Sequence, residues 1–390
     1  MSWRHILRLE LKAIFTNPAI IFTVFGGVLI YSLLYPLPYA KQLPREQQIA
    51  VVNLDNSAIS RKLVRMVDAT PQVQVMRTAS GLEEAKRWLL NRDVKGILLI
   101  PEHFQRDLML GSSPTVSFSG DAALFLVYGT VVEGLATATG TLSAKAKVAR
   151  MVVEGDSIAL AAEQYSSVKL SMQPVFNPTM GYINYIVPAV FVFILHQTLI
   201  IGSGLVSATQ NEARTRGEHG YWDSLPAWKI LFVRVTLFSL IYIPLCAYYF
   251  GLSFDTYGIS RLASIGDMVA MTLPFLISVA AFGVVVGELL PRKELVTVVV
   301  VLSSLPLVFS MGFVWPVSAL PAPVHWLVQL VPATPAINGF LRLNQMGASF
   351  EQISGWWLQL WGLAVFYVLI AFGLMLKKRR QLMQPLKSMH

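Results

Sequence analysis

Six long runs without a charged residue constrain this chain more than any other feature of its sequence. Each has at least the roughly 20 residues that a helix needs to cross about 30 Å of hydrocarbon. Only 14% of all residues are charged, whereas soluble domains typically carry about 25%. The runs are Ala13–Ala40, Leu170–Asn211, Val235–Phe254, Met268–Gly287, Leu295–Leu341 and Gln352–Leu376. The sequence therefore predicts an α-helical polytopic membrane protein with about six transmembrane helices.

The basic residues gather at one set of run ends, although Lys and Arg outnumber Asp and Glu only by 31 to 22. The two short loops at the opposite ends hold only Arg261 and Arg342. Cytoplasmic loops carry such an excess of Lys and Arg, so we expect both termini in the cytoplasm. Because topology accounts for the net charge of +9, we expect no nucleic-acid partner. The basic set is Arg4, Arg8, Lys12, Arg214, Arg216, Lys229, Arg292, Lys293, Lys377, Lys378, Arg379, Arg380 and Lys387.

Residues 1–17 are predicted to form an amphipathic helix on the cytoplasmic membrane surface. One face carries Trp3, Leu7, Leu11 and Ile14, and another carries Arg4, Arg8 and Lys12, a pattern typical of interfacial helices. The first span is predicted at 18–38, with an outer aromatic belt of Tyr31, Tyr35 and Tyr39. We expect it to be a retained anchor rather than a signal peptide, because Pro38 stands where a cleavage site needs a small residue.

Residues 39–180 are predicted to form an inserted extracytoplasmic α/β domain. Strands are expected at Gln48–Asn53, Val73–Met76, Gly96–Ile100 and Thr115–Ser119, and helices at Ser57–Val67, Gly81–Leu90 and Pro101–Leu110. Ser80 is the expected N-cap of the second helix, and Pro101 the expected first residue of the third. Residues 122–171 are predicted to form a long helical hairpin that breaks near Gly155. Cys246 is the one cysteine, so no disulfide is expected to stabilise this domain.

Residues 181–376 are predicted to form a five-helix transmembrane domain, with spans at about 182–206, 230–251, 268–287, 295–315 and 356–376. A polar cytoplasmic loop is expected at 207–229. Residues 316–350 contain five prolines at 316, 321, 323, 332 and 335, so we expect short helices at the outer interface rather than one long helix. Residues 377–390 are expected to form a basic cytoplasmic tail.

The sequence lacks every common catalytic or nucleotide-binding motif. There is no Gly-x-x-x-x-Gly-Lys-Ser/Thr, no His-Glu-x-x-His and no Gly-x-Ser-x-Gly. The six histidines are scattered, which predicts no metal site. His196 and Gln197 form the one strongly polar pair deep within a span, either as a proton relay or as side chains that face a partner helix. We therefore predict no catalytic, metal or cofactor-binding residue, and a possible intramembrane polar site at this pair.

Three further groups have both a structural and a functional interpretation. Gly283 and Gly287 have the spacing of a close-packed helix pair. Asn53, Asp55 and Asn56 follow a predicted strand, and Asp121 follows another. Side chains of this kind usually cap turns, which is the interpretation that we favour over a ligand site.

The cytoplasmic loop combines alternating charge with large apolar side chains. Its charged residues are Glu212, Arg214, Arg216, Glu218 and Asp223, and its apolar residues are Trp222, Leu225 and Trp228. A solvated linker is one interpretation. The other is a docking element in which charges orient a partner and aromatic residues fill its groove. The apolar side chains favour docking.

The order of these parts resembles that of the permease subunits of type-2 ABC exporters. The resemblance rests on Ile49–Ser57 with Gly96–Phe104, on Phe176–Pro188, and on the loop Glu212–Leu225. Through the order and spacing of these stretches the resemblance covers nearly the whole chain, and the loop departs from the family pattern at His219–Trp222. The resemblance implies that Glu212, Arg214, Arg216, Gly217, Glu218, Trp222 and Leu225 form a loop that couples transport to a partner ATPase.

The resemblance also implies partners and a location. Two permease copies or paralogues would pair with two ATP-binding-cassette subunits in a bacterial inner membrane, with ATP and Mg²⁺ bound only by the partner ATPase. A small or amphiphilic substrate such as a drug would leave the cell, and a periplasmic adaptor of the membrane-fusion type is a further partner that the resemblance allows. The substrate path is expected between the two copies, along the second and fifth spans. The alternatives are a receptor that docks an adaptor, an ion-coupled carrier and a membrane enzyme.

Overall fold

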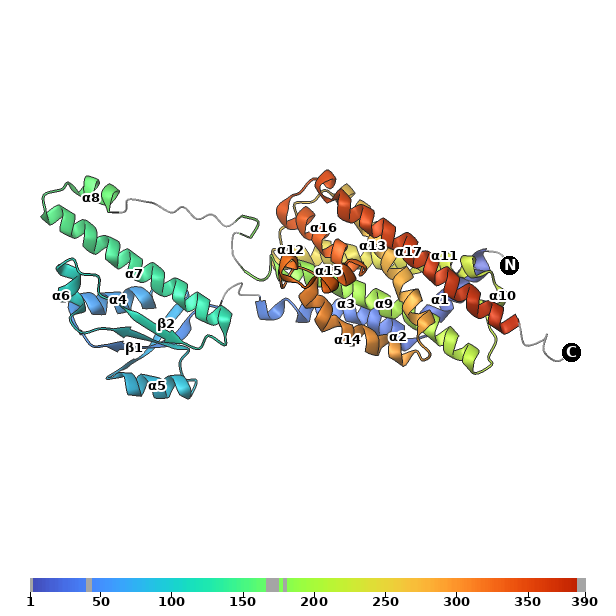
Figure 1. The fold of residues 1–390 in the computed structure, drawn as a ribbon, viewed down its shortest axis with the longest axis horizontal. Helices are drawn as coiled ribbons and strands as arrows, with labels where there is room; N and C mark the ends of the chain where they lie inside the picture. Colours follow the sequence, from blue (N-terminus) through green and yellow to red (C-terminus); the bar gives the residue numbers. More distant parts are fainter. Residues whose placement is uncertain (1–2, 40–43, 166–174, 178–180, 384–390) are drawn as a thin grey trace. The chain divides into compact units, whose positions relative to one another are not determined.

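A computed structural model describes residues 3–39, 44–165, 175–177 and 181–383, and the chain divides into two compact units (Figure 1). Unit 1 comprises residues 1–40 and 174–390, and unit 2 comprises residues 41–173. Within the described residues, six helical segments are long and apolar enough to cross a membrane: 18–39, 125–153, 186–215, 227–257, 265–289 and 350–381. The predicted class, an α-helical polytopic membrane protein, is confirmed.

The six apolar segments differ from the predicted set at one place. The segment at Phe125–Val153 is helix α7 of unit 2, which packs against the helices and strands of that unit. The predicted fifth span contains α14 (Glu294–Ser310), which has 17 residues and is shorter than each of the six segments given above. The helix stops there because Gly312, at φ 93°, turns the chain into a conformation that other residues rarely adopt.

Unit 2 is built on a four-stranded sheet with the strand order β2-β1-β3-β4. The strands are β1 (Gln47–Asn53), β2 (Val73–Ala79), β3 (Gly96–Ile100) and β4 (Ser117–Gly120). β1 pairs in parallel with β2 and β3, and β4 pairs antiparallel with β3. All four predicted strands are therefore present.

Both faces of this sheet are covered, because side chains alternate along β1. Ile49 and Val51 pack in one apolar cluster with α4 (Ala58–Asp68) and α7, whereas Ala50 and Val52 pack in a second cluster with α5 (Leu82–Leu90). Figure 1 shows α5 on one side of the sheet and α4 and α7 on the other. β1 is therefore buried on both faces.

Two predicted helix starts in unit 2 are wrong. The N-cap of α5 is Gly81, and the Ser80 N–H and Oγ–H both donate to the Glu84 carboxylate, at 2.9 and 2.8 Å. α6 (Phe104–Met109) starts three residues after Pro101, because His103 precedes it in the left-handed region at φ 60°. In both places a turn replaces the first residues of the predicted helix.

The Asx residues of unit 2 hold turns. Asn53 Oδ1 accepts from Asn56 N at 3.0 Å, and Asn53 Nδ2 donates to Ser60 Oγ at 3.0 Å. Asp55 Oδ2 accepts from the N–H of Gln105 at 3.3 Å. In the same way Asp121 Oδ1 accepts from the N–H of Ala123 at 3.0 Å. The capping interpretation is confirmed for Asn53 and Asp121, whereas Asp55 bonds to the start of α6, far along the chain.

The described part of the predicted hairpin consists of α7 and the short helix α8 (Ile158–Gln164), which pack together. Gly155, at φ 111°, lies in the turn between them, where the break was predicted. The predicted end of the hairpin, 166–171, lies outside the described residues.

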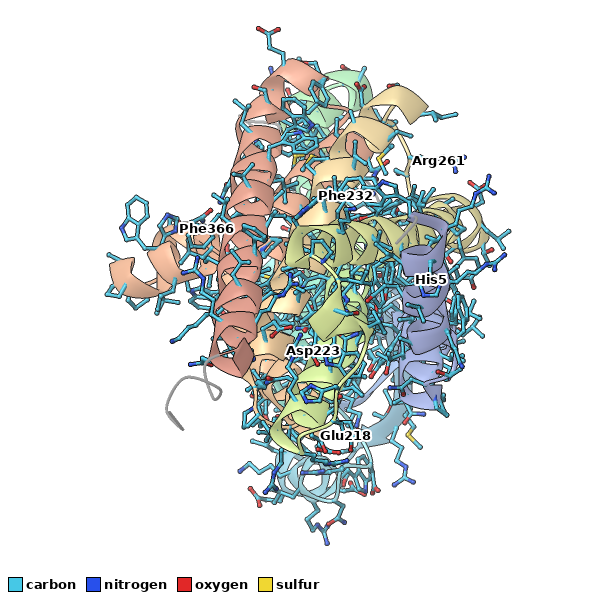
Figure 2. The ribbon with its side chains drawn as sticks, turned by 90° about the vertical axis from the view of Figure 1, so that its right-hand side faces the viewer. His5, Glu218, Asp223, Phe232, Arg261 and Phe366 are labelled. Carbon is cyan, nitrogen blue, oxygen red and sulfur yellow. The ribbon has the colours of Figure 1, made fainter. Side chains whose placement is uncertain are left out.

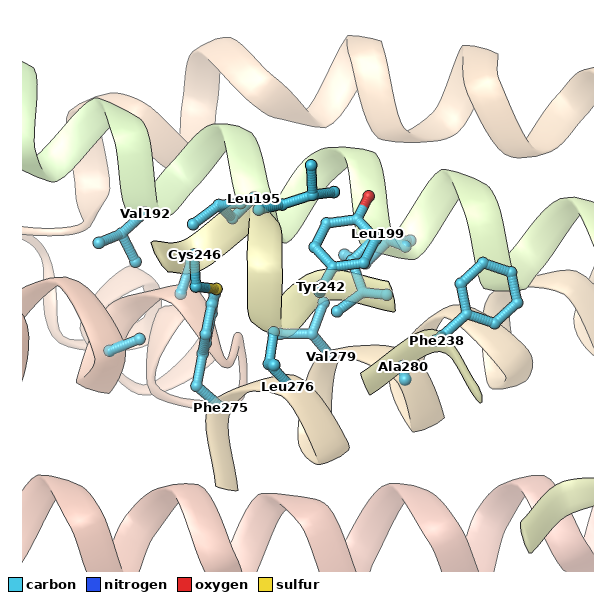
Figure 3. Close-up of a cluster of buried hydrophobic side chains, with 14 of the residues drawn as sticks. Val192, Leu195, Leu199, Phe238, Tyr242, Cys246, Phe275, Leu276, Val279 and Ala280 are labelled. Carbon is cyan, nitrogen blue, oxygen red and sulfur yellow. The ribbon is translucent and has the colours of Figure 1, made fainter. Parts of the chain in front are cut away.

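Unit 1 is organised around α9 (Ile186–Thr215). The most apolar stretch of α9, 18 residues long, is completely buried within the chain. α9 packs against α11 (Ala227–Ala247), α13 (Ile265–Leu289), α14 and α16 (Ala333–Met346). Figure 3 shows side chains of three of these helices together, with Leu195 and Leu199 from α9, Tyr242 from α11 and Val279 from α13. α17 (Phe350–Met383) packs on the outside of α13.

The remaining segments of unit 1 are shorter. α1 (Trp3–Phe15) precedes the first span, which contains α2 (Pro18–Ile21), a π-helical segment (Phe22–Gly27) and α3 (Val28–Leu34). α11 continues through a second π-helical segment (Tyr248–Ser253) into α12 (Phe254–Tyr257). After α14, the proline-rich stretch forms α15 (Ala322–Gln329) and α16. α16 contributes Phe340 and Leu343 to the core, so it packs inside the bundle rather than along its surface.

Candidate functional site

The predicted cytoplasmic loop at 207–229 is shorter in the structure, because α9 continues to Thr215. Gly217 ends this helix at φ 77°, a backbone conformation in which glycine commonly terminates helices. The chain then forms α10 (Tyr221–Ser224) and enters α11 at Ala227. Figure 2 labels Glu218 and Asp223 in this loop and His5 on α1. Five of the predicted residues therefore lie on helices rather than in an open loop: Glu212, Arg214, Trp222, Asp223 and Trp228.

A buried ion pair joins this region to the N-terminal helix. Arg234 and Glu10 are both fully buried, with Nε–Oε2 at 2.9 Å and Nη2–Oε1 at 2.7 Å. Arg234 Nη1 also donates to Ser207 Oγ at 2.7 Å, and Arg234 Nη2 donates to Gln210 Oε1 at 2.7 Å. The Tyr221 hydroxyl donates to Glu10 Oε1 at 2.8 Å and accepts from Gln210 Nε2 at 2.8 Å. These five residues, here called the Glu10 cluster, connect α1, α9, α10 and α11.

Burial and charge keep the Tyr221 hydroxyl in its donor form. Removal from water raises the pKa of Tyr221 above its ordinary value, and the negative charge of Glu10 raises it further. A buried carboxylate is stable only when its oxygens are paired and hydrogen-bonded. Tyr221 therefore supplies Glu10 with a hydrogen bond in addition to those from Arg234.

A second group of charges lies at the same end of unit 1. Glu288, at the end of α13, is fully buried and lies 3.2 Å from Lys378 Nζ and 3.6 Å from Arg214 Nη1. Arg214 Nε donates to Asp223 Oδ1 at 3.0 Å. Lys378 also donates to the backbone carbonyl of Glu288. These four residues, the Glu288 cluster, connect α9, α10, α13 and α17.

Two further contacts fasten the end of α9 to the turn between α13 and α14. Asn211 Nδ2 donates to the carbonyl of Leu290 at 2.8 Å, and Glu212 Oε2 accepts from Lys293 N at 3.4 Å. Glu212 also pairs with Arg216, four residues later and just beyond the end of α9. The predicted loop residue Glu212 thus faces this turn and Arg216 at once.

The surface presented by the loop is narrow and polar. The side chains of Arg216 and His219 are 60% and 75% exposed, and Gly217 and Glu218 are exposed between them. Trp222 is half-buried beside Tyr221, with ring centroids 5.3 Å apart. Leu225 lies in the core of this chain, so it is not available to fill the groove of a partner. We call Arg216–His219 the exposed rim.

Sequence reasoning missed most of the residues that hold the rim in place. Glu10, Ser207, Gln210, Tyr221, Arg234, Glu288 and Lys378 were not among the predicted site residues. Two signals were present. Glu10 is the one acidic residue in an otherwise basic α1, and Arg234 is the one charged residue of α11 beyond Lys229. An isolated charge of each sign in apolar surroundings predicts a pair, but not which residues meet.

The predicted glycines lie where α13 and α9 approach most closely. A Cβ on Gly287 would lie 2.2 Å from the carbonyl oxygen of Gly204, and one on Gly283 would lie 2.8 Å from that of Ile200. These distances leave no room for a side chain. The two glycines therefore allow the two helix backbones to touch within one chain.

His196 and Gln197 do not form a common site. His196 is fully buried, and its ring stacks with the rings of Phe193 and Phe282, at centroid distances of 6.1 and 6.4 Å. Neither of its nitrogens has a hydrogen-bond partner among the described residues. Gln197 Nε2 instead donates to Ser304 Oγ of α14 at 3.2 Å. Across the described ranges, no group of three or more His, Cys, Asp or Glu is placed to hold a metal ion.

Comparison with known proteins agrees with this architecture. A search among curated proteins gave no significant match. The family model of the ABC-2 family transporter proteins, in contrast, matches residues 18–372. This range includes unit 2, the loop and nearly all of the spans of unit 1, while Glu10 and Lys378 of the two clusters lie outside it. The chain therefore belongs to the ABC-2 family of transporter proteins, as a multi-pass membrane subunit.

Proposed function

We propose that this chain is the permease subunit of an ATP-binding-cassette exporter. A separate ATPase subunit binds ATP and Mg²⁺, and the permease moves a small or amphiphilic substrate outward across the inner membrane. Family membership supports the permease assignment. The direction, the substrate class and the ATPase are parts of the proposal.

One observation carries the coupling role of the loop: its exposed rim is attached to buried charges on both sides. Arg214 and Asp223 join it to Glu288 on α13 and Lys378 on α17, and Tyr221 joins it to Glu10 on α1 and Arg234 on α11. Because Glu288 contacts both Lys378 and Arg214, and Glu10 contacts both Arg234 and Tyr221, we expect a displacement of the rim to move the attached helices with it. Such a rocking of packed helices is a known type of switching transition.

We propose that two copies of the permease meet along α14. Its apolar side chains Val298, Val301, Leu302 and Leu305 are exposed in a single chain, whereas α9 is enclosed by its own chain. The expectation that the second span lines a path between two copies is therefore not retained. The revised path follows α14 of the fifth predicted span.

The proposed topology places α1, the rim and the end of α17 in the cytoplasm and unit 2 in the periplasm. The basic residues at that end of the spans support it through the positive-inside rule. A periplasmic unit 2 would be available to a membrane-fusion-type adaptor or to the substrate itself. The α/β domain with its exposed ion pairs fits a water-filled compartment.

A charge reversal that preserves the local ion pair tests the rim. In Arg216→Glu with Glu212→Lys, the two side chains still attract each other, but the charge offered to a partner is inverted. We expect the loss of ATPase binding and of stimulated ATP hydrolysis, because like charges across an interface are strongly unfavourable. The matched control is Lys86→Glu with Glu83→Lys, an exposed pair at i,i+3 in unit 2, which should leave both unchanged. Normal coupling in the loop variant would refute the assignment.

The partner is tested by purifying the chain in mild detergent from its native host. We expect a P-loop ATPase at near-equal stoichiometry, with ATP hydrolysis that the permease alone lacks. Repeated recovery of the chain without an ATPase, in several detergents, would favour the receptor alternative.

A further inference from the structure

An apolar groove runs along unit 1 between three helices. Its cavity volume is about 530 Å³, within the range of about 300–1,000 Å³ that is usual for small-molecule sites. α11 forms one wall, α13 lies at its base and α17 forms the other wall. The side chains that line it are almost all apolar: Trp228, Leu231, Phe232, Val235, Thr236, Ser239, Leu240, Ile243, Leu273, Ile277, Val368, Leu369 and Phe372.

The groove is long and narrow rather than round. Its lining on α11 extends from Trp228 to Ile243, which corresponds to about 22 Å along a helix that rises about 1.5 Å per residue. One leaflet of the hydrocarbon core is about 15 Å thick. An extended hydrocarbon chain therefore fits along this groove, starting from the end of unit 1 that carries the loop.

That end of the groove carries a cation held by aromatic rings. Lys229 Nζ lies 5.4 Å from the ring centroid of Trp228 and 5.5 Å from that of Trp3 on α1. Trp3 also makes edge contacts with Trp228 and with Phe232, whose position is labelled in Figure 2. Tryptophan and lysine in this arrangement are typical of the headgroup level of a membrane. The arrangement places a positive charge where the groove begins.

The positive charge at this end is not neutralised within the described chain. Lys229 has no acidic partner among the described residues, and neither does Arg379, which follows Phe372 by seven residues on the same face of α17. The buried or half-buried acidic residues near the loop are engaged elsewhere: Glu10 with Arg234, Glu288 with Lys378, Asp223 with Arg214 and Glu212 with Arg216. Glu218 is exposed and forms no ion pair with Lys229 among the described residues. An anionic group therefore complements the end of the groove.

We propose that this groove binds one anionic glycerophospholipid from the leaflet at the loop end. One acyl chain lies between α11 and α17, and the phosphate group contacts Lys229. Because Trp3 belongs to α1 and α1 is joined to the loop by the Glu10 cluster, the bound lipid fixes α1 against α11. The proposal does not depend on the direction of transport or on the identity of the ATPase.

The acyl-chain half of the proposal is tested by filling the groove. Thr236→Trp places a large side chain in the groove, and Leu33→Trp on α3 adds a similar side chain at a position that is 59% exposed and lies outside the groove. Native mass spectrometry would count adducts of dioleoyl phosphatidylglycerol on the full chain. We expect Thr236→Trp to lose the bound lipid and Leu33→Trp to keep it. Leu369→Trp on the opposite wall should repeat the loss, which guards against a folding defect in one variant.

The headgroup half is tested by removing the cation. The wild-type chain should prefer dioleoyl phosphatidylglycerol to dioleoyl phosphatidylcholine, and Lys229→Gln should reduce that preference about five-fold, as expected for one basic residue at an anionic surface. Lys12→Gln removes an exposed charge of α1 at the same end and is the matched control.

Three outcomes would overturn the proposal. Equal binding of the two lipids by the wild-type chain would remove the charge argument. An equal loss in Lys12→Gln and Lys229→Gln would show general attraction to a basic surface. If Thr236→Trp left lipid binding intact but changed the oligomeric mass, a second copy of the chain would be the occupant of the groove.

Discussion

The two units of this protein treat charge in opposite ways. In unit 1, Glu10, Arg234 and Glu288 are no more than 1% exposed. In unit 2, no Asp, Glu, Lys or Arg among the described residues is buried, and ion pairs such as Arg77–Asp93 are more than 40% exposed on both sides. Unit 2 is thus held together by apolar side chains and a few polar caps, whereas one end of unit 1 depends on buried ions.

This difference separates what a fold requires from what a function requires. Replacing a buried ion pair by apolar residues of similar volume is often neutral or stabilising. Stability alone therefore does not explain the Glu10 and Glu288 clusters. Both lie beside the exposed rim, which is why we assign them to coupling rather than to the architecture of the spans.

The largest expected difference in stability between the two units comes from removing one partner of the buried Glu10–Arg234 pair. Arg234→Ala leaves Glu10 buried without its cation, and we expect a loss of about 3–5 kcal/mol in unfolding free energy. The exposed counterpart in unit 2, Arg77→Ala, should cost at most about 1 kcal/mol. Thermal unfolding of the full chain in detergent measures both.

A double replacement sharpens the same test. Glu10→Met with Arg234→Met should recover most of the lost stability, because no charge remains unpaired. If the pair serves coupling, this variant should still fold and bind the ATPase but show reduced transport per ATP hydrolysed. Full transport activity would show that the pair has no coupling role.

The next largest loss of stability is expected from adding a side chain between α9 and α13, because the backbones of these helices leave no space for one. Gly287→Ala brings a methyl group to 2.2 Å from the carbonyl oxygen of Gly204, and we expect a loss of about 1–3 kcal/mol from overpacking. Gly373→Ala on α17 is the control, since nothing lies within 4 Å of its added Cβ. That variant should be neutral or slightly stabilised.

In unit 2 a polar side chain, that of Asn53, stabilises a turn. Asn53→Ala removes the bonds to Asn56 N and Ser60 Oγ, and we expect a loss of about 1–2 kcal/mol. Amide hydrogen exchange in the intact chain should show faster exchange in β1 and α4, with no change in α9 or α13. Changes that reached the Glu10 cluster would contradict the separation of the two units.

The smallest expected effect is pH-dependent and confined to unit 2. Hydrogen bonds from the N–H and Oγ–H of Ser80 hold the pKa of Glu84 below its ordinary value of 4.5. Since the folded state lowers this pKa, the contribution to stability is present above pH 4.5 and is lost as the pH falls through the folded value. After correction for the slower intrinsic exchange at low pH, the protection of amides at the start of α5 should fall as the pH drops below 4.5, and Glu84→Gln should remove that dependence.

The sequence was sufficient to predict the elements whose signal is local. Uncharged runs identified five spans. Short apolar runs between turn residues identified the strands of unit 2, because burial of β1 on both faces requires continuous apolar residues. The turn roles of Asn53 and Asp121 also followed from local chemistry. The helix break at Met311 did not, because a single glycine within an apolar run rarely ends a helix.

The site was predictable only in part, because its contacts join distant positions. Arg214 and Glu212 were singled out by charge, but the partners of Arg214 include Glu288 and those of Tyr221 include Glu10, far away in sequence. The extension of α9 to Thr215 was missed since polar residues after an apolar run look like a loop. Asn211 and Gln210 are instead buried and hydrogen-bonded to other elements.

Because α9 continues without interruption from Ile186 to Thr215, the proposed coupling would make it a lever. At about 1.5 Å per residue, its 30 residues measure about 45 Å. If the loop end serves as the pivot, a tilt of about 5° displaces the opposite end by about 4 Å. A small rotation at the loop is thereby amplified at the far side of the bundle.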